Sequence, residues 1–182
     1  MEQLKLVRPS IEYKQQYESM MEEWESFGGR LNPGALRRYS NKRQANVSYE
    51  EWLKWIEEDR NYGQDLYFLV DDNHVLGAIS IRFKRTLETA GIDGHVGFGI
   101  RPSKRNKGYA TTMLQMAFPI LKEYKINTVV ISCAKDNIGS LKVIINNGGK
   151  LIEEVIDPDN GELMQIYHLK INWWLVQEVL IW

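Results

Sequence analysis

The sequence predicts an α/β fold in which one mixed sheet is flanked by helices. Segments with apolar residues at helical spacing, such as 11–27, alternate with short apolar runs typical of strands, such as 66–70 and 128–133. A length of 182 residues suffices for one domain with a buried core that needs neither disulfides nor metal. Because the chain shows no repeat and no linker composition, we expect a single domain over 1–182.

The N-terminal third of the chain is predicted to contain one short strand and two helices. The strand covers residues 4–7, and the first helix covers 11–27, where two glycines end it. Residues 30–47 are polar and basic and are predicted to form a loop. Ser48 and Glu51 have the spacing of a capping box, which opens the second helix.

The rest of the chain alternates strands with two further helices. Pro119 lies inside the first of these helices and is expected to kink it or end it early. Asp136 and Asn137 offer an N-cap for the second helix, which the glycine-containing stretch 147–149 ends. A loop is predicted over 84–91. Strands are expected at 66–70, 75–83, 96–101, 128–133, 151–156 and 163–171.

Composition and charge exclude several classes of function. The formal net charge is −1, which gives no global attraction to nucleic acid or to an anionic membrane. Cys133 is the only cysteine, so no disulfide can form within the chain, as is typical of a reducing cytoplasm. The chain starts without the apolar region of a signal peptide, and no apolar run is long enough to span a bilayer. We therefore expect a cytoplasmic protein without nucleic acid, membrane or metal partners.

The most informative segment runs from Val96 to Ala110. It is predicted as an apolar strand that breaks at Pro102 and turns through a cationic, glycine-containing loop into a helix. The first backbone amides of a helix have no partner inside it and lie at the positive end of its dipole. Amides from Asn106 onward can therefore converge on an anion, most often a phosphate, and Gly108 permits close backbone approach. The alternative is a solvated basic turn after the strand.

The hexapeptide Arg105-Asn106-Lys107-Gly108-Tyr109-Ala110 fits the pattern R-x-x-G-x-A between a strand and a helix. Together with the Asn-capped helix that follows, this order resembles the GCN5-related N-acetyltransferase (GNAT) superfamily over residues 66–170. Segments 94–103 and 136–140 are similar to a bacterial branch of predicted acetyltransferases. The resemblance implies the GNAT fold, with a central mixed, mostly antiparallel sheet, and acetyl-coenzyme A (acetyl-CoA) as cosubstrate.

The resemblance also divides the domain and assigns its cofactor residues. Residues 1–62 would carry the acceptor side, 66–170 the cofactor-binding core, and 171–182 an apolar tail that packs on the sheet or across a homodimer interface. The loop is expected to wrap the pyrophosphate, while backbone groups of the preceding strand pair with the pantetheine arm. The residues expected to bind acetyl-CoA are Phe98, Gly99, Ile100, Arg105, Asn106, Lys107, Gly108, Tyr109, Ala110, Asn137 and Ser140.

His95 is the candidate catalytic residue. Strict alternation places it on the same strand face as Gly97 and Gly99, and such glycines invite close approach of a ligand or of another backbone. Many relatives have a general-base Glu at this distance before Arg105, and an imidazole can accept the proton that an attacking amine loses. The alternative is a histidine hydrogen-bonded within a strand pair, which would leave Asp93 or Glu88 as the candidate base. Ile144 departs from the family pattern, because many relatives have there a Tyr that protonates the departing thiolate.

These observations predict an N-acetyltransferase that moves an acetyl group from acetyl-CoA to a primary amine by direct attack on the thioester. The amine belongs to a small molecule or to a peptide. Arg37 and Arg38, with Lys42 and Arg43, form either a lip for an acidic substrate or a solvated loop. The alternative function is a non-catalytic module that binds or senses acyl-CoA. A nucleotide phosphotransferase is disfavoured because the loop lacks the G-x-x-x-x-G-K-[ST] pattern.

Overall fold

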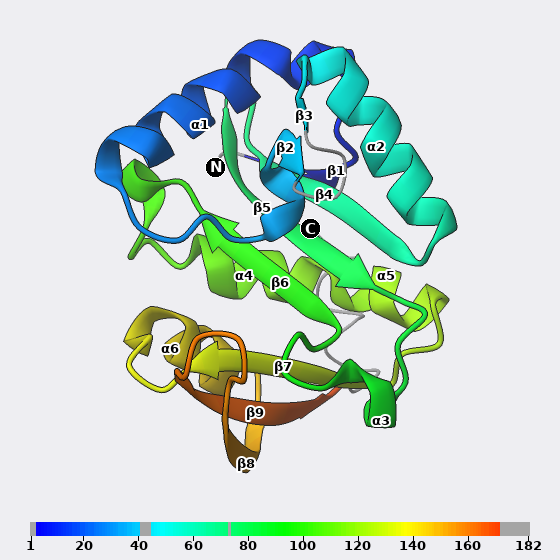
Figure 1. Ribbon diagram of the computed structural model, residues 1–182, viewed down its shortest axis with the longest axis vertical. Helices are drawn as coiled ribbons and strands as arrows, with labels where there is room; N and C mark the ends of the chain where they lie inside the picture. Colours follow the sequence, from blue (N-terminus) through cyan, green and yellow to red (C-terminus); the bar gives the residue numbers. More distant parts are fainter. Residues whose placement is uncertain (1–2, 41–44, 73, 172–182) are drawn as a thin grey trace. The chain divides into compact units, whose positions relative to one another are not determined.

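The computed structural model describes residues 3–40, 45–72 and 74–171 (Figure 1). The chain divides into two compact units, the first formed by Met1–Ile81 and Gly97–Ala110 and the second by Arg82–Val96 and Thr111–Trp182. Of the apolar tail that the sequence places at 171–182, residues 172–182 lie outside the described residues, and so does the proposed packing of this stretch.

The first unit contains a four-stranded sheet in the order β1-β4-β5-β6. β1 pairs antiparallel with β4, so that Leu6 lies opposite Leu69. β6 follows β5 at the other end, where the Arg101 amide donates to the Leu76 carbonyl. The strands are β1 (Lys5–Val7), β4 (Gln64–Val70), β5 (Val75–Arg82) and β6 (Val96–Ile100).

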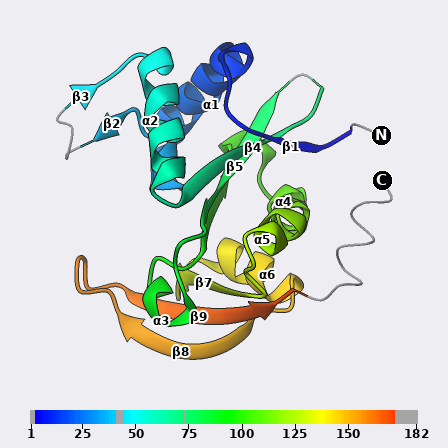
Figure 2. The same ribbon diagram turned by 90° about the vertical axis from the view of Figure 1, so that its right-hand side faces the viewer.

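Two helices, α1 (Lys14–Phe27) and α2 (Tyr49–Asn61), pack on this sheet (Figure 2). Aromatic residues at helical spacing form the core between them. Tyr17 of α1 stacks on Trp52 of α2 with ring centroids 4.8 Å apart, and Phe68 of β4 stacks on both rings. All three side chains are buried, and rings of this size each stabilise the fold by roughly 1.5–3 kcal/mol.

Short elements precede and follow these helices. Ser48 caps α2, since its hydroxyl accepts from the Glu51 amide as predicted. A turn of 3₁₀ helix, η1 (Ile11–Tyr13), leads into α1, and α1 ends at Gly28. The segment predicted as a loop holds a second 3₁₀ turn and a two-stranded ribbon. They are η2 (Gly34–Leu36), β2 (Tyr39–Ser40) and β3 (Ala45–Asn46).

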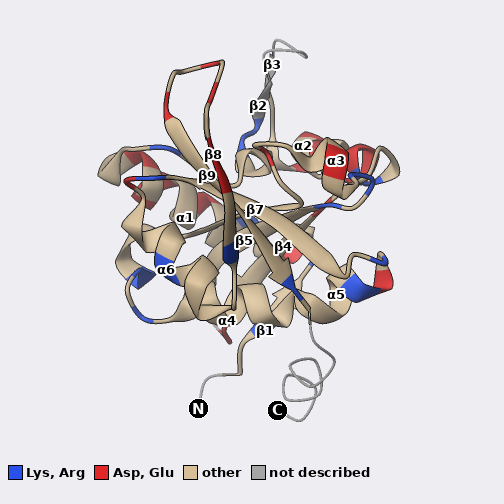
Figure 3. Ribbon diagram, turned by 90° about the horizontal axis from the view of Figure 1, so that it is seen from below, with Lys and Arg blue, Asp and Glu red and all other residues tan. Residues whose placement is uncertain are grey.

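The second unit is built on a three-stranded antiparallel sheet in the order β7-β9-β8. The hairpin that joins β8 to β9 carries acidic residues at its tip (Figure 3). Asn137 caps α6, and the helix break predicted at Pro119 separates α4 from α5. The bounds are α3 (Leu87–Ala90), α4 (Tyr109–Met116), α5 (Phe118–Glu123), β7 (Thr128–Ala134), α6 (Ile138–Asn146), β8 (Lys150–Ile156) and β9 (Leu163–Lys170).

The α/β class and the antiparallel pairing agree with the sequence prediction, but the single sheet is wrong. The strands are divided between a four-stranded and a three-stranded sheet, with the β2-β3 ribbon apart from both. Apolar alternation identifies a strand without identifying its neighbour, which explains the error. The loop predicted over 84–91 contains α3, whose four residues are too few to show a helical period.

Candidate functional site

The turn between β6 and α4 has a backbone suited to an anion. After a 3₁₀ turn, η3 (Pro102–Lys104), Asn106 has a φ of 59° and Gly108 a φ of 83°. Gly adopts such left-handed conformations without steric cost. A β carbon at Gly108 would meet no atom within 4 Å, so a ligand can approach the backbone here.

Three amides of this loop have no partner among the described residues. Among the residues that the structure describes, the backbone N–H groups of Asn106, Lys107 and Gly108 donate to no acceptor of the protein. All three residues are exposed, and α4 begins directly after them at Tyr109. Grouped donors at the positive end of a helix dipole are the arrangement that binds phosphate, so the loop fits the pyrophosphate of acetyl-CoA.

Glu23 of α1 holds the start of this loop. Its carboxylate accepts from Arg101 Nε at 2.7 Å and from both the amide and the hydroxyl of Ser103. Arg101 also donates to Ser19 Oγ at 3.2 Å. Burial acts to raise the pKa of Glu23, but the hydrogen bonds from Ser103 and Arg101 outweigh it and lower that pKa. The carboxylate is therefore ionised at neutral pH and fixes the turn before the loop.

Arg105, the first residue of the motif, directs its side chain toward α1. Its Nε donates to the Ile100 carbonyl at 3.0 Å, and its guanidinium carbon lies 5.2 Å from the Trp24 ring centroid and 4.8 Å from that of Phe27. Cation–π contacts of this kind fix the guanidinium in place. Trp24 and Phe27 could not be predicted as supports of the loop, because helical spacing identifies aromatic residues only as a packing face.

The glycine face of β6 is covered by the segment that follows α1. A β carbon at Gly99 would clash with the Asn32 carbonyl oxygen and with the Trp24 ring. The close approach that glycine permits on this face is therefore made by the Asn32 backbone. Asn32 Nδ2 donates to the Phe98 carbonyl at 2.9 Å. The carbonyls of Phe98 and Ile100 thus both accept from side chains, and their pairing with a pantetheine arm stays a prediction.

His95, in the second unit, has a backbone partner at each ring nitrogen. Nδ1 accepts from the Val130 amide at 2.8 Å, and Nε2 lies 3.1 Å from the Arg85 carbonyl, which can only accept. Nε2 must therefore carry the proton. The residue is 2% exposed, and burial is the main cause that lowers its pKa. This neutral, fully bonded imidazole favours the structural alternative, and the catalytic role stays an unsupported prediction.

The other candidates of the second unit lie on β7 and α6. Asn137 Oδ1 accepts from the Ser140 amide at 3.0 Å, which confirms the predicted N-cap, while a cofactor role for either residue stays a prediction. Ile144 is fully buried in the core. Cys133 is buried as well, and burial raises the pKa of its thiol to about 11, so it is protonated at neutral pH.

The predicted site residues are divided between the units. Phe98 to Ala110 belong to the first unit, whereas His95, Asn137 and Ser140 belong to the second. In the stretches 3–40, 45–72 and 74–171, no group of three side chains is arranged to hold a metal ion. No helix within those stretches combines the length and the apolar character needed to cross a membrane.

The profile of the acetyltransferase (GNAT) domain matches residues 12–150, well over half of the chain. The chain belongs to the GNAT family. The family is that of acetyltransferases, and its profile includes the β6 strand, the anion loop and the capped helix α6 described above. The resemblance seen in the sequence is therefore confirmed, and with it acyl transfer as the class of activity.

Solved structures of GNAT acetyltransferases have the same fold. An acetyltransferase of Salmonella typhimurium that modifies the N-terminal serine of ribosomal protein L7/L12 is 17% identical, with a TM-score of 0.66 over 93% of this chain and 95% of that one. The microcin C7 self-immunity acetyltransferase MccE, in complex with acetyl-CoA and AMP, is 15% identical, with a TM-score of 0.63 over 92% of each chain. YncA of Salmonella typhimurium, a putative acetyltransferase with acetyl-CoA, is 13% identical, with a TM-score of 0.61 over 93% and 95%. No curated protein sequence matches this chain.

Proposed function

We propose that this GNAT-family chain transfers the acetyl group of acetyl-CoA to a primary amine. The observation that carries the proposal is the row of unpartnered amides at Asn106, Lys107 and Gly108, directly before α4. A hydrogen bond to a charged acceptor is worth roughly 1.5–3 kcal/mol, so three of them supply much of the roughly 8 kcal/mol of micromolar binding.

Further residues are proposed to contact the rest of the cofactor. Backbone groups of Phe98 and Ile100 are proposed to line the pantetheine arm, with Asn137 and Ser140 as further contacts. Lys107 is exposed beside the loop amides and adds attraction for the phosphates. When bound, acetyl-CoA supplies a thioester whose carbonyl carbon the acceptor amine attacks. No covalent link to the protein is required, and the buried Cys133 thiol takes no part.

The proton of the attacking ammonium is proposed to leave to solvent. His95 offers no lone pair for it, because Nδ1 accepts from Val130 and Nε2 carries hydrogen toward Arg85. Ile144 has no proton to give to the departing thiolate, so that proton also comes from water. A base acting through solvent gives a rate that rises with pH until the acceptor amine itself is deprotonated.

The acceptor is proposed to be a small-molecule or peptide amine. The structurally similar Salmonella typhimurium protein that modifies the N-terminal serine of ribosomal protein L7/L12 supports a peptide amine within this fold. The complexes of MccE and YncA with acetyl-CoA support the choice of donor. A cytoplasmic location is proposed from the single, buried, unreactive thiol of Cys133.

A homodimer is a further part of the proposal. β8 is one edge strand of its described sheet, and three of its apolar residues are 50–61% exposed: Leu151, Ile152 and Ile156. Exposed apolar residues on an edge strand favour association with another chain. Light scattering over a range of protein concentrations measures the oligomeric state, and a monomer at every concentration would contradict this part.

Calorimetry and thiol release together test the main proposal. Calorimetry with CoA and acetyl-CoA measures binding, and a thiol reagent measures CoA release across a broad panel of amines. Binding with turnover of at least one amine is the expected result. Absence of binding to both CoA and acetyl-CoA would contradict the proposal. Tight binding without turnover would instead favour a non-catalytic acyl-CoA sensor. The hydrogen-bonded His95 and the apolar Ile144 are consistent with that alternative, because neither can transfer a proton.

A further inference from the structure

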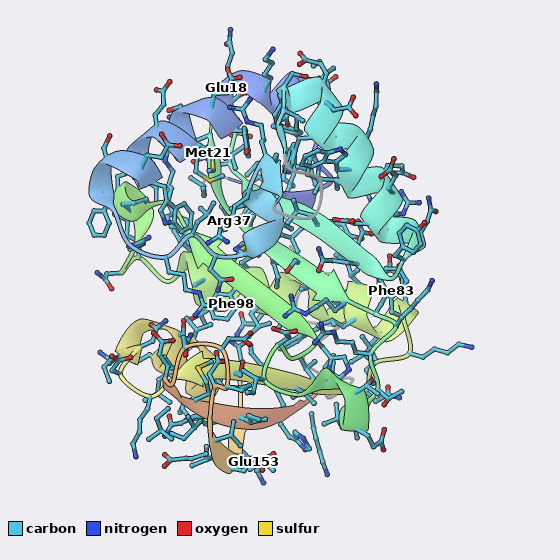
Figure 4. All side chains as sticks on the ribbon, in the orientation of Figure 1. Glu18, Met21, Arg37, Phe83, Phe98 and Glu153 are labelled. Atoms are coloured by element: carbon cyan, nitrogen blue, oxygen red, sulfur yellow. The ribbon has the colours of Figure 1, made fainter. Side chains whose placement is uncertain are left out.

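The first unit contains an open pocket of about 530 Å³ between α1 and the segment that follows it. Met21, Trp24 and Leu31 supply an apolar wall. Arg37 directly follows η2 and lines the same pocket. Figure 4 shows Met21 extending from α1 and Arg37 extending from the segment after α1. A concave apolar wall with a few polar groups is the usual form of a small-ligand site.

Arg37 supplies a positive charge that no described residue neutralises. In the part of the chain that the structure describes, its guanidinium has no hydrogen bond and no ion pair. Arg38, also in the pocket wall, differs: it lies 3.9 Å from the Glu18 carboxylate and over the Tyr17 ring. A guanidinium without a partner beside an aromatic wall can take a carboxylate in a bidentate arrangement.

Two further residues of the pocket, Trp24 and Glu25, restrict the kind of ligand that it can bind. Trp24 lines the pocket with its ring, and its buried Nε1 has no acceptor among the described residues. Glu25 is exposed on the same wall, and its negative charge repels a multiply charged anion such as a phosphate ester while attracting an ammonium group. The combination favours a singly charged carboxylate on a molecule that also carries an amine.

The pocket wall is continuous with strand β6. Trp24 and the Asn32 backbone lie against Gly99, and Asn32 Nδ2 donates to the Phe98 carbonyl. Phe98 and Ile100 are the residues proposed above to line the arm that carries the thioester. A ligand in this pocket therefore lies beside the strand where the acetyl group is proposed to be held.

We propose that this pocket binds the acceptor, and that the acceptor is an amino acid or short peptide with a free carboxylate and an apolar or aromatic side chain. Arg37 binds the carboxylate, and Met21, Trp24 and Leu31 contact the side chain. This inference rests on the proposed acetyl transfer, because it names the acceptor class of that reaction.

The experiment compares hydrophobic and aromatic L-amino acids, each paired with its carboxamide, which keeps the amine and loses the charge. Thiol release gives kcat/KM for each compound, and calorimetry with the CoA-bound protein gives the affinity independently of turnover. We expect the carboxylate member of the best pair to be favoured at least tenfold in both measurements. Equal or better use of the amides throughout the series would overturn the inference.

Two variants separate recognition by Arg37 from a general effect of charge. Arg37→Ala is expected to reduce the preference for the carboxylate to below threefold without changing the KM for acetyl-CoA. Arg30→Ala removes the same charge from the same segment, but Arg30 does not line the pocket, so this control should keep the preference. If both variants act alike, Arg37 does not recognise the carboxylate. Absence of CoA binding and of any turnover would be a different result, since it removes the proposed function itself.

Discussion

The loop from Arg105 to Ala110 and the segment around His95 differ in whether their polar groups have hydrogen-bond partners. Three successive amides of the loop, at Asn106, Lys107 and Gly108, are exposed and have no acceptor among the described residues. The His95 imidazole is buried, and both of its nitrogens have backbone partners within 3.1 Å. The loop has bonding capacity left for a ligand, whereas the histidine has none.

This difference indicates that the loop is available to bind a ligand, whereas His95 stabilises the fold. A buried polar group must find partners within the protein, so it contributes to the native structure. Exposed backbone donors that converge at a helix start are solvated until an anion replaces the water. Variants of both regions can therefore break or sharpen this contrast.

His95→Ala should lower the free energy of unfolding by about 2–4 kcal/mol, because it leaves the Val130 amide and the Arg85 carbonyl unsatisfied and opens a cavity. Urea unfolding measures the change. His74→Ala is the matched control, since the His74 side chain is 49% exposed in a hairpin turn and should cost far less. Acetyl-CoA affinity should stay within about twofold. An intact stability with a lost kcat would restore His95 as a catalytic residue.

Gly108→Val should raise the Kd for acetyl-CoA at least tenfold, or about 1.4 kcal/mol, because a β-branched residue resists a φ of 83° and fills the space before the amides. Calorimetry gives the Kd. Gly161→Val is the control: Gly161 has a φ of 76° and equally open space, but it lies in the β8-β9 hairpin. Equal loss of affinity in both variants would remove the loop from the site.

Asn137→Ala should destabilise the protein by about 1 kcal/mol, because the cap of α6 loses its acceptor for the Ser140 amide. Asn137→Asp keeps that acceptor and should preserve stability in thermal unfolding. Both variants lack the side-chain N–H donors, so a drop in acetyl-CoA affinity in both would assign the amide group to the cofactor, whereas a drop with Asp alone would report repulsion by its charge. Unchanged affinity in both variants would leave Asn137 as a cap only.

The pH dependence of stability gives the smallest effect. Because burial lowers the pKa of His95, the unfolded chain binds a proton at a higher pH than the folded one does. The contribution of His95 is therefore complete above about pH 6.5 and declines as the pH falls below it. Unfolding measured from pH 8 to pH 5 should show this decline, and His95→Gln should show less of it. An identical decline in the variant would assign the effect to other groups.

Much of the fold could be predicted because its signals are local. Helix α1 ends at Gly28, α6 begins at its Asn137 cap, and Pro119 lies at the start of α5 after a break. Each of these depends on conformational preference or on hydrogen bonds within one turn. The left-handed φ of Gly108 is likewise a property of its own backbone.

The supports of the site could not be predicted, because their partners are distant in the chain. Glu23 and Arg101 are 78 residues apart, and Asn32 and Phe98 are 66 residues apart. An acid on an amphipathic helix normally faces water, so nothing in the local sequence marks Glu23 as a partly buried anchor of the loop. The same holds for Arg37, whose place in a pocket depends on the path of the chain after α1.

The sequence by itself determined the family, the order of the longer helices and strands, and the loop whose amides can receive a diphosphate, because caps, turns and periodicity act over a few residues. Only the tertiary structure decided that His95 is saturated by Val130 and Arg85, that Arg105 turns to Trp24 and Phe27, and that the strands form separate sheets. Those outcomes depend on which distant groups meet when the core is buried, and the pattern of one chain does not specify such pairs.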